Sequence, residues 1–183
     1  MSLRRRYERR KGYRMNIIEI KHCSVGDTRT ANHAPTIEEF SDANALHIKD
    51  VKSMVSAYGY EIAESQKGNY WECSGHDWTK QKEPYKSEFY HNLCDTINGH
   101  MNFMDGEWIR KHYDLERHHL NDRCPDDVTL IDVIEMIADN VCAGLARSGE
   151  IRPVEIKPEV LALAVKNTAE FMAHHVKLTN GSD

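Results

Sequence analysis

Histidine is unusually frequent in this sequence, with 11 residues in a chain of 183. One of them stands beside an aspartate in the segment Gly75–Lys80, as the pair His76-Asp77. Adjacent imidazole and carboxylate groups offer a divalent cation two ligands without the ordering of a long loop. Such a pair also arises by chance, and in the simpler interpretation His76 caps a helix while Asp77 is solvated.

Two further groups of residues could complete a site with this pair. His47 lies upstream, beside the apolar stripe of the first predicted helix. Asp132, Glu135 and Asp139 are spaced by three and four residues, which stacks their carboxylates on one helical face. Stacked like charges destabilise a helix unless a positive group, such as a metal ion, neutralises them. The alternative is a solvated acidic face, which suits Asp132 and Glu135 better than Asp139.

A third group lies in the stretch Trp108–His119. His112 and His119 would project from one face of a continuous helix, with His118 about 100° away. Buried imidazoles need hydrogen-bond partners for both ring nitrogens, and neutral imidazole is the commonest metal ligand. We therefore expect His112, and one of His118 or His119, to face the same cavity as the His-Asp pair.

The order of these residues resembles the HD-domain superfamily of metal-dependent phosphohydrolases, in which a histidine, a His-Asp pair and an aspartate follow one another. Lys80 and the later His118-His119 resemble the HDxxK and HH elements of the cyclic-dinucleotide phosphodiesterase branch. The full glycine-tyrosine-proline signature of that branch is absent. The segments around His47, HDWTK, the histidine-rich stretch and VIEMIADN also look like an uncharacterised family of small phage and bacterial proteins. The resemblance covers roughly residues 42–147.

The resemblance implies four core metal ligands and three more whose spacing varies between branches: His47, His76, Asp77 and Asp139, then His112, His118 and His119. Mixed imidazole and carboxylate ligands suit one or two ions of manganese, iron, cobalt, nickel or zinc better than calcium. Lys80 would neutralise a phosphate oxygen as charge builds in the transition state. Glu135 would orient a ligating histidine or act as a general base for the water.

The implied function is hydrolysis of a nucleotide or another small phosphorylated metabolite by a metal-activated water. Two alternatives stay open: an HD-type di-iron oxygenase, and a non-catalytic, phage-encoded protein whose metal only holds the fold. A net charge of -5 argues against a broad nucleic-acid-binding surface. No long apolar run predicts a membrane span, and 5 scattered cysteines without a CxxC pair favour a reducing compartment, the cytoplasm or a phage host's cytoplasm. The oligomeric state stays open, and a homodimer is compatible with the sequence.

Helices are the elements that would position these residues. The sequence predicts one all-α domain over residues 15–178, a compact HD-type bundle of about five helices, between a basic flexible tail at 1–14 and a short flexible tail at 179–183. Residues 16–20 predict a short strand or an extended lead-in, and Met15 could be the natural start. The predicted helices span 36–68, opened by a capping box of Thr36 and Glu39, then 85–104, 108–119, 130–148 and the stretch from Pro158 onward.

Apolar spacing also predicts which helical faces are buried. In the fourth predicted helix these residues are Leu130, Ile134, Ile137, Val141 and Leu145. In the last helix they are Val160, Leu161, Leu163, Ala164 and Phe171.

Overall fold

The computed structural model describes residues 18–20, 33–57 and 75–178. Within these ranges the chain forms five α-helices and two short 3-10 helices: α2 (Ile37–Ala57), η1 (Trp78–Lys80), α4 (Tyr85–Ile97), η2 (Phe103–Asp105), α5 (Glu107–Leu115), α6 (Leu130–Ser148) and α7 (Pro158–His174). No strand occurs in this described part, and residues 18–20 have no regular secondary structure. The prediction of an all-α fold is therefore confirmed. None of the described helices is both long enough and apolar enough to cross a membrane.

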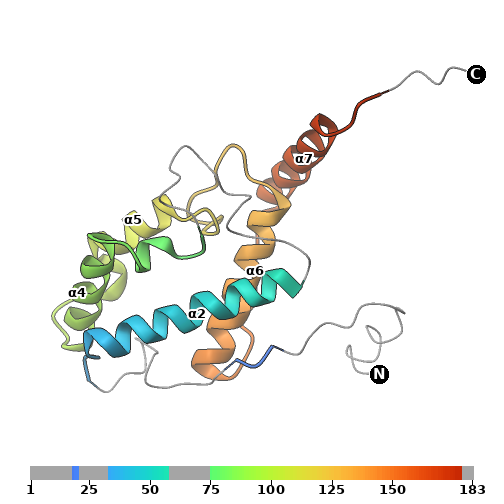
Figure 1. Ribbon diagram of the computed structural model, residues 1–183. Coiled ribbons are helices and arrows are strands. Elements are labelled where there is room, and N and C mark those ends of the chain that lie inside the picture. Colours follow the sequence, from blue (N-terminus) through green and yellow to red (C-terminus); the bar gives the residue numbers. More distant parts are fainter. Residues whose placement is uncertain (1–17, 21–32, 58–74, 179–183) are drawn as a thin grey trace, which may run out of the picture.

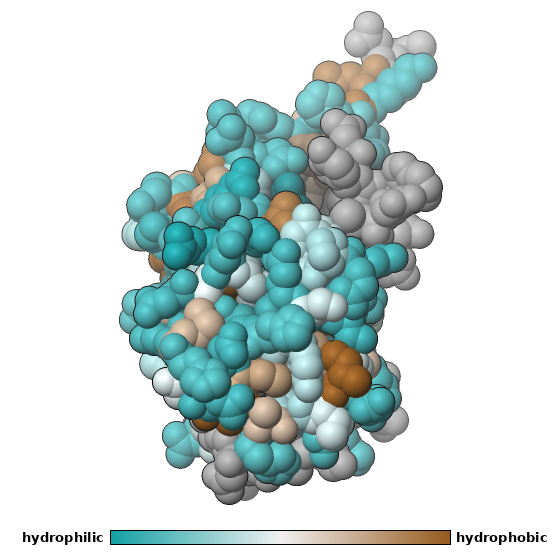
Figure 2. Space-filling view, turned by 90° about the vertical axis from the view of Figure 1, so that its left-hand side faces the viewer, coloured by the Kyte–Doolittle hydropathy of each residue, from teal (hydrophilic) through white to brown (hydrophobic). Residues whose placement is uncertain are grey.

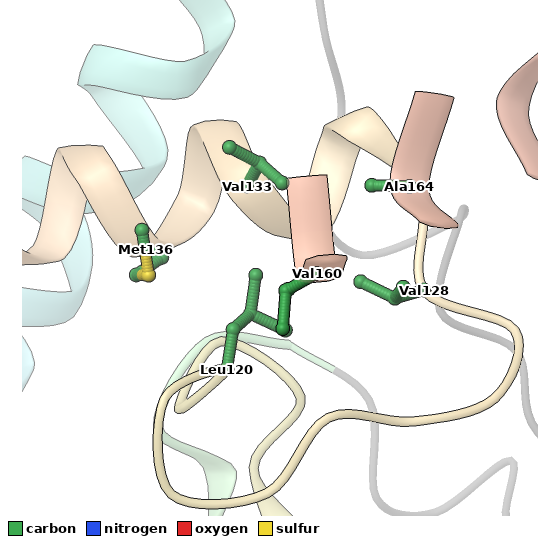
Figure 3. Packing of buried hydrophobic residues seen from close by; sticks show 6 residues of the cluster. All are labelled: Leu120, Val128, Val133, Met136, Val160 and Ala164. Carbon is green, nitrogen blue, oxygen red and sulfur yellow. The ribbon is translucent and has the colours of Figure 1, made fainter. Parts of the chain in front are cut away.

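Figure 1 shows α2 lying across α6, with α4 and α5 gathered near one end of α2 and α7 beyond one end of α6. Three apolar clusters hold this arrangement together. Between α2 and α6 the buried residues include Val51 and Cys142, and between α4 and α5 the rings of Phe89 and Trp108 stack with centroids 3.9 Å apart. The third cluster joins α6, α7 and the loop before α6 (Figure 3). The three apolar clusters share no residue. The histidines and carboxylates predicted to bind metal lie on the helices that these clusters join and on the segments between them.

The start of α2 follows the prediction from the sequence. Glu39 N donates to Thr36 Oγ1 over 3.2 Å, and Thr36 N donates to Glu39 Oε2 over 2.8 Å. This reciprocal capping box satisfies two backbone donors at the helix start. The predicted continuation of this helix to Gly68 lies outside the described residues, which stop at Ala57.

Two predicted helices end earlier than expected. α4 stops at Ile97 rather than 104, and Gly99, with φ 75°, turns the chain away in a left-handed conformation. α5 stops at Leu115, because Glu116 adopts an extended backbone and its side chain is buried in a tertiary contact. The pair His118-His119 therefore lies on the loop after α5, and the prediction that His119 shares a helical face with His112 is wrong.

α6 begins at a second capping box, formed by Thr129 and Asp132, and ends at Gly149, which has φ 73°. Its buried face differs from the predicted one. Glu135 is 1% exposed and Asp132 is 2% exposed, whereas Ile137 is 42% exposed. The interpretation of Asp132 and Glu135 as a solvated acidic face is therefore wrong.

α7 is buried along fewer residues than predicted. Val160 and Ala164 pack against α6, but Leu161 is 39% exposed and Phe171 is 61% exposed. The helix contacts the body through its first turns, and every described residue from 169 onward is exposed. Apolar spacing in the sequence predicted one buried face for this helix. In the structure its apolar residues lie on two faces, one buried and one exposed.

Candidate metal centre

Four donor atoms from three separate parts of the chain meet at one point. His47 projects from α2, His76 and Asp77 precede η1, and Asp139 projects from α6. His47 Nε2 lies 2.9 Å from Asp139 Oδ1, 3.3 Å from Asp77 Oδ2 and 3.3 Å from His76 Nε2. All four residues offer one ligand atom within 4.8 Å of the others.

These separations match those of ligands that share one ion. Metal bonds of about 2.0–2.3 Å place neighbouring ligand atoms about 2.8–3.8 Å apart in octahedral or tetrahedral geometry. His76 Nε2 lies 3.4 Å from Asp77 Oδ2 and 3.7 Å from Asp139 Oδ1, within this range. Without a cation, the Nε2 atoms of His47 and His76, 3.3 Å apart, have to share one proton between two rings. With a bound cation, both nitrogens can act as ligands and no shared proton is needed.

The other oxygen of Asp77 faces a second group of imidazoles. Its Oδ1 lies 3.5 Å from His112 Nε2 and 3.6 Å from His118 Nε2, and His119 Nε2 lies 2.8 Å from His112 Nε2. Oδ1 is fully buried, and no group in the described part of the chain hydrogen-bonds to it. A buried anionic oxygen is costly unless a cation or a donor neutralises it. The donor set therefore fits a metal ion on this side of Asp77 as well.

Glu135 contacts a histidine in each group from behind. Its Oε1 lies 2.9 Å from His76 Nδ1 and 3.3 Å from His118 Nδ1. A carboxylate on Nδ1 fixes the ring so that Nε2 points the other way, toward Asp77. Glu135 therefore has the position that the orienting role requires. It is buried on the Nδ1 side of the two rings, opposite the Nε2 atoms that would bind metal.

Thr79 and Glu116 support the centre and were not expected from the sequence. His112 Nδ1 lies 2.7 Å from Thr79 Oγ1, which donates over 2.8 Å to Glu116 Oε1, and Thr79 N donates to the same oxygen over 2.8 Å. Burial, followed by the charge of Asp77, raises the pKa of Glu116 to about 8. The chain from Glu116 through Thr79 fixes the ring of His112 with Nε2 toward Asp77. No local pattern signals this contact, because it joins positions 37 residues apart.

His118 and Glu135 form a buried ion pair in the metal-free protein. Burial opposes the charged form of both groups, but their mutual attraction outweighs it. Glu135 first, and then the charges of Asp77 and Asp139, raise the pKa of His118 to about 9 against the effect of burial. Against burial, hydrogen bonds from His118 and His76 lower the pKa of Glu135 to about 2. Metal binding at His118 would therefore release a proton.

The other two imidazoles of this group are already in the form that binds metal. Burial, followed by the charge of Lys80, holds the pKa of His112 well below its usual range. Burial, followed by the charge of His118, lowers the pKa of His119 to about 3. Both rings are neutral at pH 7, as metal coordination requires.

Lys80 contacts the centre directly. Its Nζ donates to Asp77 Oδ2 over 2.5 Å, and its charge, against the effect of burial, holds the pKa of Asp77 well below the usual range. The side chain also lines a cavity of about 470 Å³, together with His112, His119 and Asp139. Three of the seven predicted ligand residues therefore border this cavity.

Asp132 does not belong to the centre. Its Oδ1 accepts from Arg117 Nε over 2.8 Å, and its Oδ2 caps α6 at Thr129. All seven predicted ligands do converge, in two groups that share Asp77.

Comparison of the chain with family models, curated proteins and solved structures gave no match. The interpretation of the centre therefore depends on its own geometry.

Proposed function

We propose that this protein is a metal-dependent phosphohydrolase of the HD type, acting on a nucleotide or another small phosphorylated metabolite. The proposal rests on the position of Asp77, whose two carboxylate oxygens face two different groups of imidazoles beside a cavity. His47, His76 and Asp139 would hold one ion with Asp77 Oδ2. His112, His118 and His119 would hold a second with Asp77 Oδ1. Bound divalent ions in such a pair acidify water and polarise a phosphoryl oxygen.

The cavity offers contacts suited to the rest of such a substrate. Its lining includes the aromatic rings of Phe103 and Tyr113, on which a nucleobase can pack, and the guanidinium of Arg152. Among the described residues, no carboxylate lies within ion-pair distance of Arg152, so its charge is available to an anion. Guanidinium groups bind phosphate oxygens in a bidentate manner. Lys80, already held by Asp77, adds a second cation near the donor atoms.

Metal analysis followed by a phosphate-release screen tests this proposal. Purified protein is loaded separately with manganese, iron, cobalt, nickel or zinc, and phosphate release is measured across nucleoside mono-, di- and triphosphates and sugar phosphates. We expect up to two ions per chain and metal-dependent release from at least one nucleotide. The Asp77→Ala variant is the matched control and should be inactive with every metal.

The large number of imidazoles favours one competing function. Together the two groups contain five imidazoles and two carboxylates, which also suit a pair of iron ions, so an oxygenase is the second candidate. Oxygen consumption by the iron-loaded protein, without phosphate release from any substrate, would replace the hydrolase proposal with this one. Metal binding without either reaction would instead favour a purely structural metal.

A further inference from the structure

The last helix carries an apolar stripe that nothing in the described structure covers. Val165 is 50% exposed and Met172 is 63% exposed. Ala162 and Ala169 are exposed as well. Figure 1 shows α7 extending away from the body, and Figure 2 shows apolar side chains among hydrophilic ones in the same upper part of the molecule. Contiguous apolar surface on a helix usually marks an interface.

The spacing of the stripe is that of a helix pairing seam. Ala162, Val165, Ala169 and Met172 are spaced by three, four and three residues, which places them within one arc of the helix. Val160 and Ala164, which pack against α6, lie on a different arc. α7 therefore has two apolar faces, and only one of them is used within the chain.

We propose that a second copy of this chain covers the stripe, with the two α7 helices antiparallel about a two-fold axis. In this register Val165 faces Ala169 of the partner subunit, and Met172 faces Ala162 of the partner subunit. Each layer then pairs a large side chain with a small one, which lets the helices approach closely and leaves no void. A two-fold interface uses the same patch on both copies, so the assembly closes at two subunits.

The charges beside the stripe match this arrangement. Lys166 and Glu170 lie next to the stripe on the same flank and form an i,i+4 pair, 3.8 Å apart. In an antiparallel pair, each flank of one helix faces the same flank of the other helix. Lys166 therefore comes near Glu170 of the partner subunit, and Glu170 comes near Lys166 of the partner subunit. A parallel arrangement would place these flanks on opposite sides. No residue of α7 lines the cavity at the metal centre, so this inference stands independently of the proposed function.

Sedimentation of the full-length protein over a range of concentrations tests the proposal. We expect a monomer–dimer equilibrium in the wild type. Val165→Glu and Met172→Glu should each raise the dimer dissociation constant by at least about 100-fold, because they bury an unpaired carboxylate. Ile151→Glu is the matched control, since Ile151 is 62% exposed but lies outside α7, and it should not change the equilibrium. Circular dichroism should show unchanged helicity in all three variants, because each side chain is exposed in a single chain.

Disulfide trapping tests the orientation. Protein carrying Ala162→Cys is mixed with protein carrying Met172→Cys, oxidised and digested, and cross-linked peptides are identified by mass spectrometry. We expect a 162–172 link in the mixture. A dominant 162–162 link in the single variant would establish a parallel pair and overturn the proposal. A wild type that stays monomeric at every concentration would also overturn it, as would a monomer that binds vesicles or another protein through Val165.

Discussion

The carboxylate of Asp77 has to serve two groups of imidazoles at once. Its backbone lies in the left-handed region at φ 55°, a conformation that costs a non-glycine residue about 1 kcal/mol or more. This conformation turns Oδ2 toward His47 and Oδ1 toward His112. Strain of this kind persists where the surroundings enforce it, and here it places one side chain between two sets of donors.

Changing Asp77 and Lys80 should have different consequences. Asp77→Ala removes a donor from both groups, so metal content and turnover should both collapse. Lys80→Ala should retain its metal at pH 8, because a bound cation takes over the role of Lys80 beside Oδ2. Turnover should still fall by about 2–4 kcal/mol of transition-state stabilisation. Metal analysis and a rate for each variant make the comparison, and unchanged hydrolysis in Lys80→Ala would show that Lys80 only partners Asp77.

Thr79 should affect the second ion selectively. Thr79→Val keeps the shape of the side chain but removes the hydroxyl between His112 and Glu116, so the ring of His112 loses its fixed orientation. We expect metal content to fall from two ions to one, or affinity for the second ion to fall about 10- to 100-fold. Thr79→Ser restores the hydroxyl and should restore the second ion. Equal loss of both ions in Thr79→Val would indicate general misfolding.

Metal binding should release a proton from His118. Its pKa of about 9 means that the ring is charged at pH 7.5 in the metal-free protein, and a ligating imidazole must be neutral. Calorimetry in two buffers of different ionisation enthalpy should give a release that includes about one proton from His118. Against burial, Asp139 and Asp77 also raise the pKa of His47, so His47 adds to the release. In Glu135→Gln the strongest influence raising the pKa of His118 is gone, so burial lowers this pKa and the release should fall by about one proton. The same release in wild type and Glu135→Gln would locate the proton elsewhere.

The sequence alone predicted the residues of the centre better than their supports. His47, His76, Asp77 and Asp139 were expected to converge, and they do, because residue type and order carry that information. Thr79 and Glu116 carry no such pattern. Their role arises from a contact between η1 and the end of α5, which exists only once the chain has folded.

At the scale of elements, helix starts were easier to predict than helix ends. α2 and α6 begin where a threonine and an acidic residue three positions later form a capping box, a signal contained in four residues. α5 ends at Leu115 for a tertiary reason, since Glu116 leaves the helix to reach Thr79. That early end places His118 and His119 on a loop, from which both side chains join His112 beside Asp77.

Gly144 determines how the segment after α6 packs. A Cβ at this position would lie 2.6 Å from Glu150 O and 3.2 Å from Arg152 N. Gly144→Ala should therefore displace this segment and cost about 1–3 kcal/mol of unfolding free energy. It should also weaken phosphate binding, because Arg152 lines the cavity. Denaturant unfolding and phosphate titration measure both effects. Gly99→Asn is the control, with open space around its Cβ and a left-handed φ that asparagine tolerates.

At the scale of the whole molecule, the metal centre adds a polar connection between helices that apolar packing already joins, since Phe40 of α2 packs against α4 and α5 and Val51 of α2 packs against α6. Its donors come from α2, the segment before η1, α5, the following loop and α6, while the three apolar clusters are distinct. Metal should therefore stabilise the arrangement of the helices more than the helices themselves. Chelator-treated protein should stay helical at 25 °C, since each cluster is apolar and needs no ion.

The melting temperature should depend on the free metal concentration. At about 100 times its dissociation constant, one bound ion adds about 2.7 kcal/mol, which corresponds to about 5–11 °C for a chain of this size. Melting curves with chelator and with increasing metal measure this shift, at one protein concentration so that any dimerisation is held constant. Asp77→Ala should melt at the same temperature with and without metal. An equal metal-dependent shift in Asp77→Ala would mean that the stabilising ion binds elsewhere on the chain, and that the convergence on Asp77 does not hold the helices together.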